Sequence, residues 1–308
     1  MKHIFLKTVL AALLMGGVTT SCINDLNISS VDPQSSSTYG DMELLAKVYS
    51  TLGLTGQRGP AGSGDISSDE GESGFYRTTF NLQELCTDEC LWAWQTDVDI
   101  PQITNIGWTS SSVRVQWAFQ RLAFDVTLCN FYLENTEGKA EEADYKRYRA
   151  EVRFLRALHM WYFLDLWGKA PFKTNFDIYE YPVEKAGKEL YDWIDKELTE
   201  IEPQLAEVGE FNNSTNFGRA DRGAAYMLHA RLALNSEVYT KGAVKDYQKA
   251  IDYCNLLDGK YELSKTTKNG YTGYEQVFMA DNDQNTQAMR EIIFPIRQDG
   301  VKTKSYSG

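Results

Sequence analysis

Apolar residues recur at the spacing of an amphipathic helix along most of the chain, and this pattern limits the folds open to it. A first helix is expected behind Asp41, a favourable N-cap, because Leu44, Val48 and Leu52 follow on one face. Further helices are predicted over residues 113–132, 145–166, 189–208, 221–237 and 246–257. The fold class predicted from the sequence is therefore mainly α.

Neighbouring helices are expected to pack as antiparallel pairs. The ranges 221–237 and 246–257 are separated by a short turn, and in both of them small residues alternate with Tyr and Leu. This arrangement resembles a tetratricopeptide unit, although the strict repeat signature is absent. Pro203 should kink or split the helix over 189–208, because proline has no backbone N–H to donate. We therefore expect a stack of tetratricopeptide-like helical pairs.

Helical periodicity is missing from residues 53–112. The segment is rich in Gly, Ser and acidic residues, yet it is also aromatic. Its aromatic residues include Phe75, Tyr76, Phe80, Trp92, Trp94 and Trp108. An excursion of this length inside a compact domain is usually functional or disordered, and the aromatic content argues against disorder. The sequence therefore predicts a long irregular, aromatic-rich loop insertion that carries the functional site.

The N-terminus has the pattern of an export signal. Lys2 and Lys7 accompany an apolar stretch that is shorter than the roughly 20 residues of a membrane-spanning helix. Small residues then precede Cys22, which suits a lipoprotein signal peptidase. We interpret 1–21 as a lipoprotein signal peptide and Cys22 as the lipidation site. The alternative is an ordinary secretory signal that is cut near Ser21.

The mature chain is predicted to have two parts. Residues 22–40 are mostly polar and cannot bury enough apolar surface to fold alone, so they are expected to form a flexible tether. Residues 41–308 are expected to form the helical domain. Acyl chains on Cys22 would anchor this domain to a membrane.

Charge and cysteine content exclude some partners. The formal net charge is -12 and the pI is near 4.8, so nucleic acid is a poor partner. No cysteine spacing is typical of a zinc site. Cys86 and Cys90 are four residues apart and could form a disulfide or remain free thiols. Cys129 and Cys254 lie in apolar helical patterns, so we expect both to be buried.

Several motifs are similar to the SusD family of outer-membrane glycan-binding lipoproteins. These motifs are SCINDL at 21–26, RFLRALH at 153–159, DLWGKAPF at 165–172 and FGRAD at 217–221. The similarity to the starch-binding member extends to EGESGFYRTTF at 70–80 and TDECLWAWQ at 87–95, and it covers essentially the whole chain. The family fold is longer, so the resemblance implies an N-terminal portion from which the C-terminal part of the fold is missing.

The resemblance implies a function and a set of site residues. A SusD-like protein binds starch or another α-glucan oligosaccharide at the cell surface and passes it to a TonB-dependent, SusC-like porin of the outer membrane. By position, Arg77, Trp92 and Tyr306 fall where the starch-binding member contacts its glucan, and Asp97 falls where that member has Asn. The same comparison implies a structural calcium ion, the one cofactor expected, near Asp281, Asp283 and Asn285.

The chemistry of these residues suits a sugar. An aromatic face packs against the C–H side of a sugar ring, and the guanidinium of Arg77 donates in a planar fork to neighbouring hydroxyls. An ionised Asp97 only accepts hydrogen bonds, so binding is expected to survive with an altered preference. The alternatives are that Arg77 pairs with loop acids and that Trp92 anchors the loop on the helices. For Trp94 the anchoring interpretation is preferred.

Three rival functions follow from the same sequence. A glycosidase needs two carboxylates across the substrate, whereas Asp88 and Glu89 are adjacent, and His159 and His229 lie among apolar neighbours in predicted helices. We therefore expect no enzyme activity. The second rival is a helical-repeat scaffold that contacts only the porin. The third is a SusD-like paralogue that binds a different glycan.

Overall fold

The computed structural model describes residues 39–56, 64–66, 71–97, 99–213, 215–301 and 303. The chain divides into two compact units, 1–40 and 41–308, and the description below concerns the second. The predicted signal peptide, Cys22 and Tyr306 lie outside the described residues and stay predictions. No helix in the described ranges is long and apolar enough to cross a membrane.

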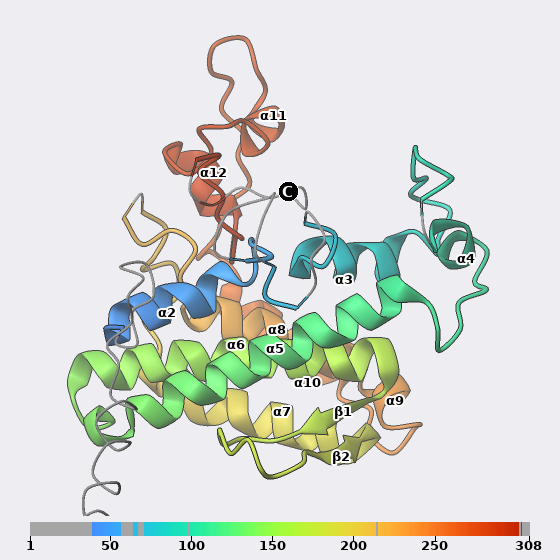
Figure 1. Ribbon diagram of the computed structural model, residues 1–308. Helices are drawn as coiled ribbons and strands as arrows, with labels where there is room; N and C mark the ends of the chain where they lie inside the picture. Colours follow the sequence, from blue (N-terminus) through green and yellow to red (C-terminus); the bar gives the residue numbers. More distant parts are fainter. Residues whose placement is uncertain are drawn as a thin grey trace, which may run out of the picture. The chain divides into compact units, whose positions relative to one another are not determined.

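The domain is mainly α, as the sequence predicts. Its long helices are α5 (Val113–Asn135), α6 (Ala143–Trp167), α7 (Gly187–Ile201), α8 (Arg222–Leu234) and α10 (Tyr247–Leu257). Figure 1 shows α5 and α6 running side by side, and α6 also packs against α7 while α8 packs against α10. The tetratricopeptide-like helical pairs are therefore present. The apolar faces of α5, α6, α7 and α8 meet in one core around residues such as Leu155, Met160 and Phe163.

Local sequence determines where these helices end. Gly168 adopts a left-handed conformation, with φ of 68°, and ends α6, because glycine has no Cβ to oppose it. α7 ends at Ile201, and a short 3₁₀ turn over Glu202–Gln204 contains Pro203, so the predicted split is confirmed. The side chain of Asp221 caps α8 by accepting the first backbone N–H groups.

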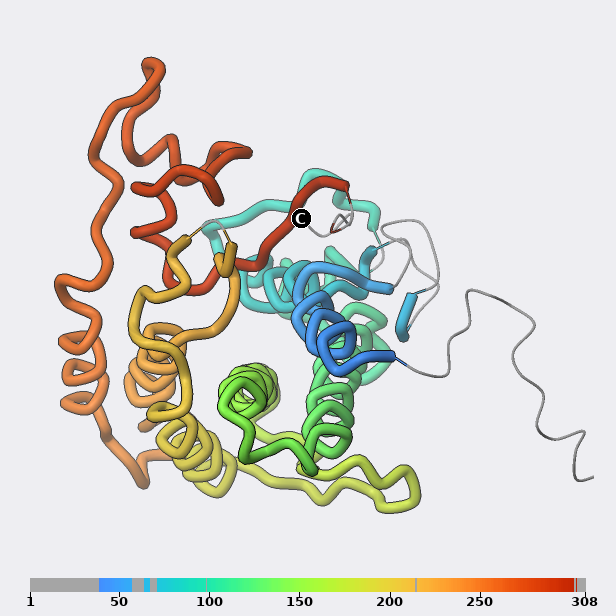
Figure 2. The backbone as a smooth tube through the Cα atoms, turned by 90° about the vertical axis from the view of Figure 1, so that its left-hand side faces the viewer, coloured from blue at the N-terminus to red at the C-terminus, as the bar shows by residue number. Residues whose placement is uncertain are grey.

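Shorter elements connect and cover the stack. They are α2 (Asp41–Ser50), the antiparallel strands β1 (Lys169–Phe172) and β2 (Val183–Ala186), α9 (Ser236–Tyr239), α11 (Gly273–Val277) and α12 (Thr286–Glu291). In β1 and β2, Lys169 pairs with Ala186. Figure 2 shows the red segment after α12 returning towards α2. There Phe294 packs edge-on against Phe154 of α6, with 5.4 Å between ring centroids.

The segment 53–112 is less irregular than predicted, because it contains α3 (Phe75–Glu84) and α4 (Ile100–Thr104). The buried face of α3 includes Thr78, Thr79 and Asn81, so its helical period is carried by polar residues. Both threonine hydroxyls donate to backbone carbonyls four residues earlier, which satisfies them within the helix. A search for apolar periodicity cannot find such a helix.

The cysteine predictions have mixed outcomes. Cys129 is buried in the core, as expected. Cys254 is exposed, so the prediction of burial is wrong. Its helix, α10, buries only Ala250 and Leu257, and Cys254 stays exposed although its spacing places it on the same side of the helix. Cys86 and Cys90 are both free thiols in this structure, which favours the unbridged alternative.

Candidate functional site

Three of the four predicted glycan-binding residues lie together. Arg77 is on the first turn of α3, and its guanidinium carbon lies 5.2 Å from the centre of the Trp92 ring. The indole N–H of Trp92 donates to Oδ2 of Asp97 at 3.1 Å. These residues come from separate points of the segment 75–97, so the fold of the loop brings them together.

Sequence reasoning missed two members of this group, Glu72 and Arg114, and Arg114 lies on the first turn of α5. It is 1% exposed, and its Nη2 lies 3.5 Å from Glu72 and 3.7 Å from Asp97. Its guanidinium carbon is also 5.9 Å from the centre of the Trp92 ring. We refer to Glu72, Arg77, Trp92, Asp97 and Arg114 as the Trp92 cluster.

A sequence signal for Arg114 existed. The positions of α5 that face inward include Arg114, Ala118, Arg121, Leu122 and Asp125, which share one helical stripe. Charged residues are seldom fully buried unless they are paired. Arg or Lys residues at the core-facing positions of a helix therefore predict carboxylate or carbonyl partners on the elements packed against that helix.

The charges of the Trp92 cluster balance. Oε1 of Glu72 lies 3.4 Å from Arg77 and 3.5 Å from Arg114, so one carboxylate joins both guanidinium groups. Asp97 supplies the second carboxylate. The alternative that Arg77 pairs with a loop acid is thus observed, but the pairing occurs within the cluster and holds Arg77 beside Trp92. The result is a charge-balanced cluster in which both guanidinium groups are mostly buried, while the two carboxylates and the Trp92 ring are partly exposed.

The Trp92 ring packs against apolar side chains of the same loop segment. The buried members of this small apolar cluster are Leu85, Ile100 and Ile103. Trp94 differs, because it is 67% exposed and touches Trp92 edge-on with 5.9 Å between ring centroids. The preferred interpretation of Trp94 as a residue packed onto the helices is therefore wrong. Its ring is presented to solvent beside a fixed aromatic neighbour.

This arrangement provides what a sugar ring needs. Exposed indole surface can cover the apolar face of a sugar, while carboxylate and guanidinium groups accept from and donate to its hydroxyls. A groove of about 1150 Å³ borders α3 at Tyr76, the residue before Arg77, and is also lined by Phe278, Asn282 and Arg297. No residue of the Trp92 cluster lines this groove, and Tyr76 is the point at which groove and cluster come nearest in the sequence.

Two of the three predicted calcium ligands serve other partners in the structure. Oδ2 of Asp283 lies 3.1 Å from Arg297, and the side chain of Asn285 caps α12. Asp281 is exposed. Within the described ranges, no three His, Cys, Asp or Glu residues are grouped so that they could hold a metal ion. Because calcium requires six to eight oxygen ligands, these three residues do not fit such a site as they are arranged here.

The sequence of this chain was compared with those of known proteins. No protein-family model matches the chain. It is 53% identical over 309 residues to the starch-binding protein SusD of Bacteroides thetaiotaomicron, a match that covers 100% of this chain and 53% of SusD. The chain therefore spans about half the length of that relative.

Solved structures with the same fold are more distant in sequence. A SusD-like protein from Bacteroides fragilis superposes with a TM-score of 0.61 at 21% identity, covering 82% of this chain and 43% of that one. A laminarin-binding SusD-like protein has a TM-score of 0.56 at 17% identity, covering 80% of this chain and 49% of that one. In sequence and in fold, the chain is a relative of SusD, matched along its whole length to part of that protein.

Proposed function

We propose that the protein binds α-glucan oligosaccharides of the starch type, at the surface of an outer membrane, without acting on them chemically. The observation that carries the proposal is the Trp92 cluster, in which Arg77, Trp92 and Asp97 form one fixed group. The 53% identity to a starch-binding protein over the whole chain supports the choice of ligand.

Other glycans are the main alternative. A neighbour of the same fold binds laminarin, so the fold alone does not select the sugar. The selection depends on the loops, and the two motifs 70–80 and 87–95 lie in the segment that forms the Trp92 cluster. Their similarity to the starch-binding relative favours α-glucan.

Absence of catalysis is part of the proposal. The carboxylates of Glu72 and Asp97 both face guanidinium groups, whereas a glycosidase uses one as an acid and the other as a base or nucleophile. His159 and His229 are fully buried in helices. The cluster therefore supports recognition and gives no reason to assign a reaction.

The remaining parts of the proposal concern location and transfer. Acyl chains on Cys22 would hold the domain on the membrane, and an aromatic platform of this kind binds weakly enough to release its sugar to a SusC-like porin. A calcium ion near Asp281, Asp283 and Asn285 would require the side chains of Asp283 and Asn285 to turn away from their present partners.

The proposal can be tested by electrophoresis of the full-length protein through native gels that contain amylose, inulin or xylan. We expect amylose to retard the wild type most. Trp92→Ala should abolish most of this retardation, because it removes the ring that Arg77 and Asp97 hold. Tyr179→Ala is the matched control, since this aromatic residue is 88% exposed on the β1–β2 connection and lies outside the cluster.

The outcomes separate the rival functions. Equal retardation of the wild type and Trp92→Ala would favour a scaffold that contacts only the porin. Stronger retardation by inulin or xylan would favour a paralogue with another glycan. Release of reducing sugar from soluble starch would contradict the absence of catalysis.

A further inference from the structure

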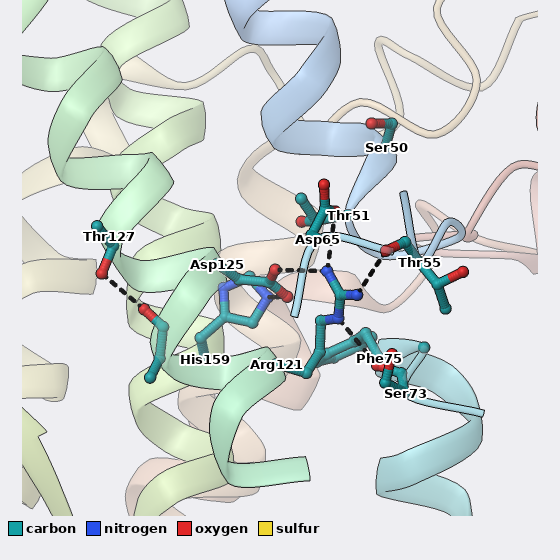
Figure 3. A network of polar contacts seen from close by, with 12 residues as sticks. Ser50, Thr51, Thr55, Asp65, Ser73, Phe75, Arg121, Asp125, Thr127 and His159 are labelled. Atoms are coloured by element: carbon teal, nitrogen blue, oxygen red, sulfur yellow. Dashed lines mark hydrogen bonds and ion pairs between the residues drawn. The ribbon is translucent and has the colours of Figure 1, made fainter. Parts of the chain in front are cut away.

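A single buried guanidinium, that of Arg121 on α5, binds three separate points of the segment that precedes the site. Its Nη2 donates to the carbonyl of Thr55 at 3.0 Å, and its Nε donates to the carbonyl of Ser73 at 2.9 Å. Its Nη1 lies 3.2 Å from Oδ2 of Asp65. Figure 3 shows these groups converging on one planar fork.

A second row of buried polar side chains lies behind this guanidinium. Nη1 of Arg121 is 3.6 Å from Oδ1 of Asp125, and the other oxygen of Asp125 lies 3.3 Å from Nε2 of His159 on α6. All three side chains are buried. On the opposite side, Lys47 of α2 lies 2.9 Å from Asp65. The guanidinium on α5 is therefore linked to α6 through Asp125 and to α2 through Asp65.

The contact at Ser73 lies next to the Trp92 cluster in the chain. Glu72 precedes Ser73 and pairs with both Arg77 and Arg114. Phe75, the first residue of α3, packs edge-on against His159 with 5.2 Å between ring centroids. The entry to α3 is thus held by its backbone and by its first ring, two residues before Arg77.

We propose that Arg121 is a positioning residue, which fixes Glu72 and the first turn of α3 so that Arg77 and Trp92 present one preorganised surface to the glycan. The inference rests on the proposed function and deepens it. Arg114 and Arg121 are seven residues apart on the same face of α5, so one helix serves both as the wall of the site and as its anchor.

Arginine is required for this role by geometry. A planar fork donates in three directions at once, whereas the ammonium of lysine is a point charge on a flexible stem. Arg121→Lys therefore keeps the charge beside Asp65 and Asp125 but cannot reach both carbonyls. Arg156→Lys is a matched control, because Arg156 on α6 also binds three groups, Asn130, Thr174 and Glu197, away from the Trp92 cluster.

Two measurements on the full-length protein test the proposal. Without sugar, backbone amides of residues 71–80 should exchange hydrogen faster in Arg121→Lys than in the wild type, and should be unchanged in Arg156→Lys. With maltoheptaose, Arg121→Lys should bind about tenfold more weakly, the effect of losing hydrogen bonds to a charged group, whereas Arg156→Lys should keep wild-type affinity at a similar loss of melting temperature. Asp65→Asn weakens one contact of the three and should show a smaller change in both measurements.

The double variant Arg121→Lys with Arg77→Lys should lose less affinity than the two single changes predict together, because both act through the placement of one guanidinium. Unchanged exchange over 71–80 in Arg121→Lys would overturn the anchoring, whatever the sugar result. If Arg156→Lys lost as much affinity as Arg121→Lys, the weaker binding would follow from lower overall stability. That result would also overturn the proposal. Failure of the wild type to bind any glucan would instead refute the proposed function, and the exchange experiment would still decide the anchoring.

Discussion

The helical stack and the Trp92 cluster use the same residue types in different ways. In the stack, Arg153 and Arg156 of α6 grip one carboxylate, Glu197 of α7, so paired charges join two helices. Around the Trp92 cluster, Arg121 instead binds the backbone carbonyls of Thr55 and Ser73, in the chain before α3. The paired charges of the helical stack stabilise the fold, whereas those around the Trp92 cluster position the residues of the site.

This comparison teaches that burial alone does not identify a functional charge. Arg114, Arg121 and Arg156 are all buried, yet only the first two contact the segment that carries the aromatic residues. The relevant question is what the guanidinium holds. Variants in the two regions should therefore differ in which property they change, stability or affinity for the sugar.

The largest expected effect is on the stack. Glu197→Ala leaves Arg153 and Arg156 without their shared carboxylate, and breaking a buried pair in this way costs about 3–5 kcal/mol of unfolding free energy. Burial alone would raise the pKa of Glu197, but hydrogen bonds and charge from the two arginines lower it, so the carboxylate is ionised when the protein is folded at neutral pH. Urea unfolding measures the loss.

Glu200→Ala is the control for this prediction. Glu200 pairs with the same Arg153 but is largely exposed, so its loss should cost about 0–1 kcal/mol. Folded Glu197→Ala protein should keep wild-type retardation in amylose. A selective loss of retardation at full folding would show that the stack and the site are not separable in the way we infer.

The two regions also differ in how well the sequence predicts them. Helices α5 to α8 and α10 are predictable because their apolar residues repeat at helical spacing, and Pro203 and Gly168 mark two of their ends. The sequence does not predict α3 because polar residues, Thr78, Thr79 and Asn81, fill most of its buried positions where apolar ones would mark a helix.

Within the site, resemblance identified Arg77, Trp92 and Asp97, and the structure brings these three together. The resemblance did not identify Arg114 or the exposure of Trp94, because both depend on how the loop lies against α5. Tyr306 stays a prediction, since it lies outside the described residues. Contacts between segments far apart in the chain are what a single sequence conceals.

An effect of intermediate size is expected from pH, which should change the unfolding free energy through a residue of the helical stack. Burial raises the pKa of Asp221, the cap of α8, from 3.8 to about 6. A carboxyl whose pKa is higher in the folded state binds its proton more tightly there, so its contribution to stability is present at low pH and is lost as pH rises from about 4 to about 6. The rise in pKa corresponds to about 3 kcal/mol.

The control for the pH prediction is Asp221→Asn. This variant still accepts from the N–H groups of Gly223 and Ala224 through its amide oxygen, but it cannot titrate. It is less stable overall, because its amide N–H₂ faces the N–H of Gly209. Between pH 4 and 6 its unfolding free energy should fall less steeply than that of the wild type, and parallel slopes would exclude Asp221 as the cause.

The smallest effect is expected from a change at Trp94. Unlike the stack variants, it should change affinity for the sugar and leave stability nearly unchanged. Because the ring is 67% exposed, Trp94→Ala should change the unfolding free energy by no more than about 0.5 kcal/mol. Loss of an aromatic contact with a sugar should nevertheless weaken binding of maltoheptaose by about two- to tenfold, measured by calorimetry. Tyr181→Ala, an exposed aromatic change outside the cluster, should leave both quantities unchanged. Lower stability with unchanged affinity in Trp94→Ala would place this ring with the structural residues, and the sugar surface would then be limited to Trp92 and its charged neighbours.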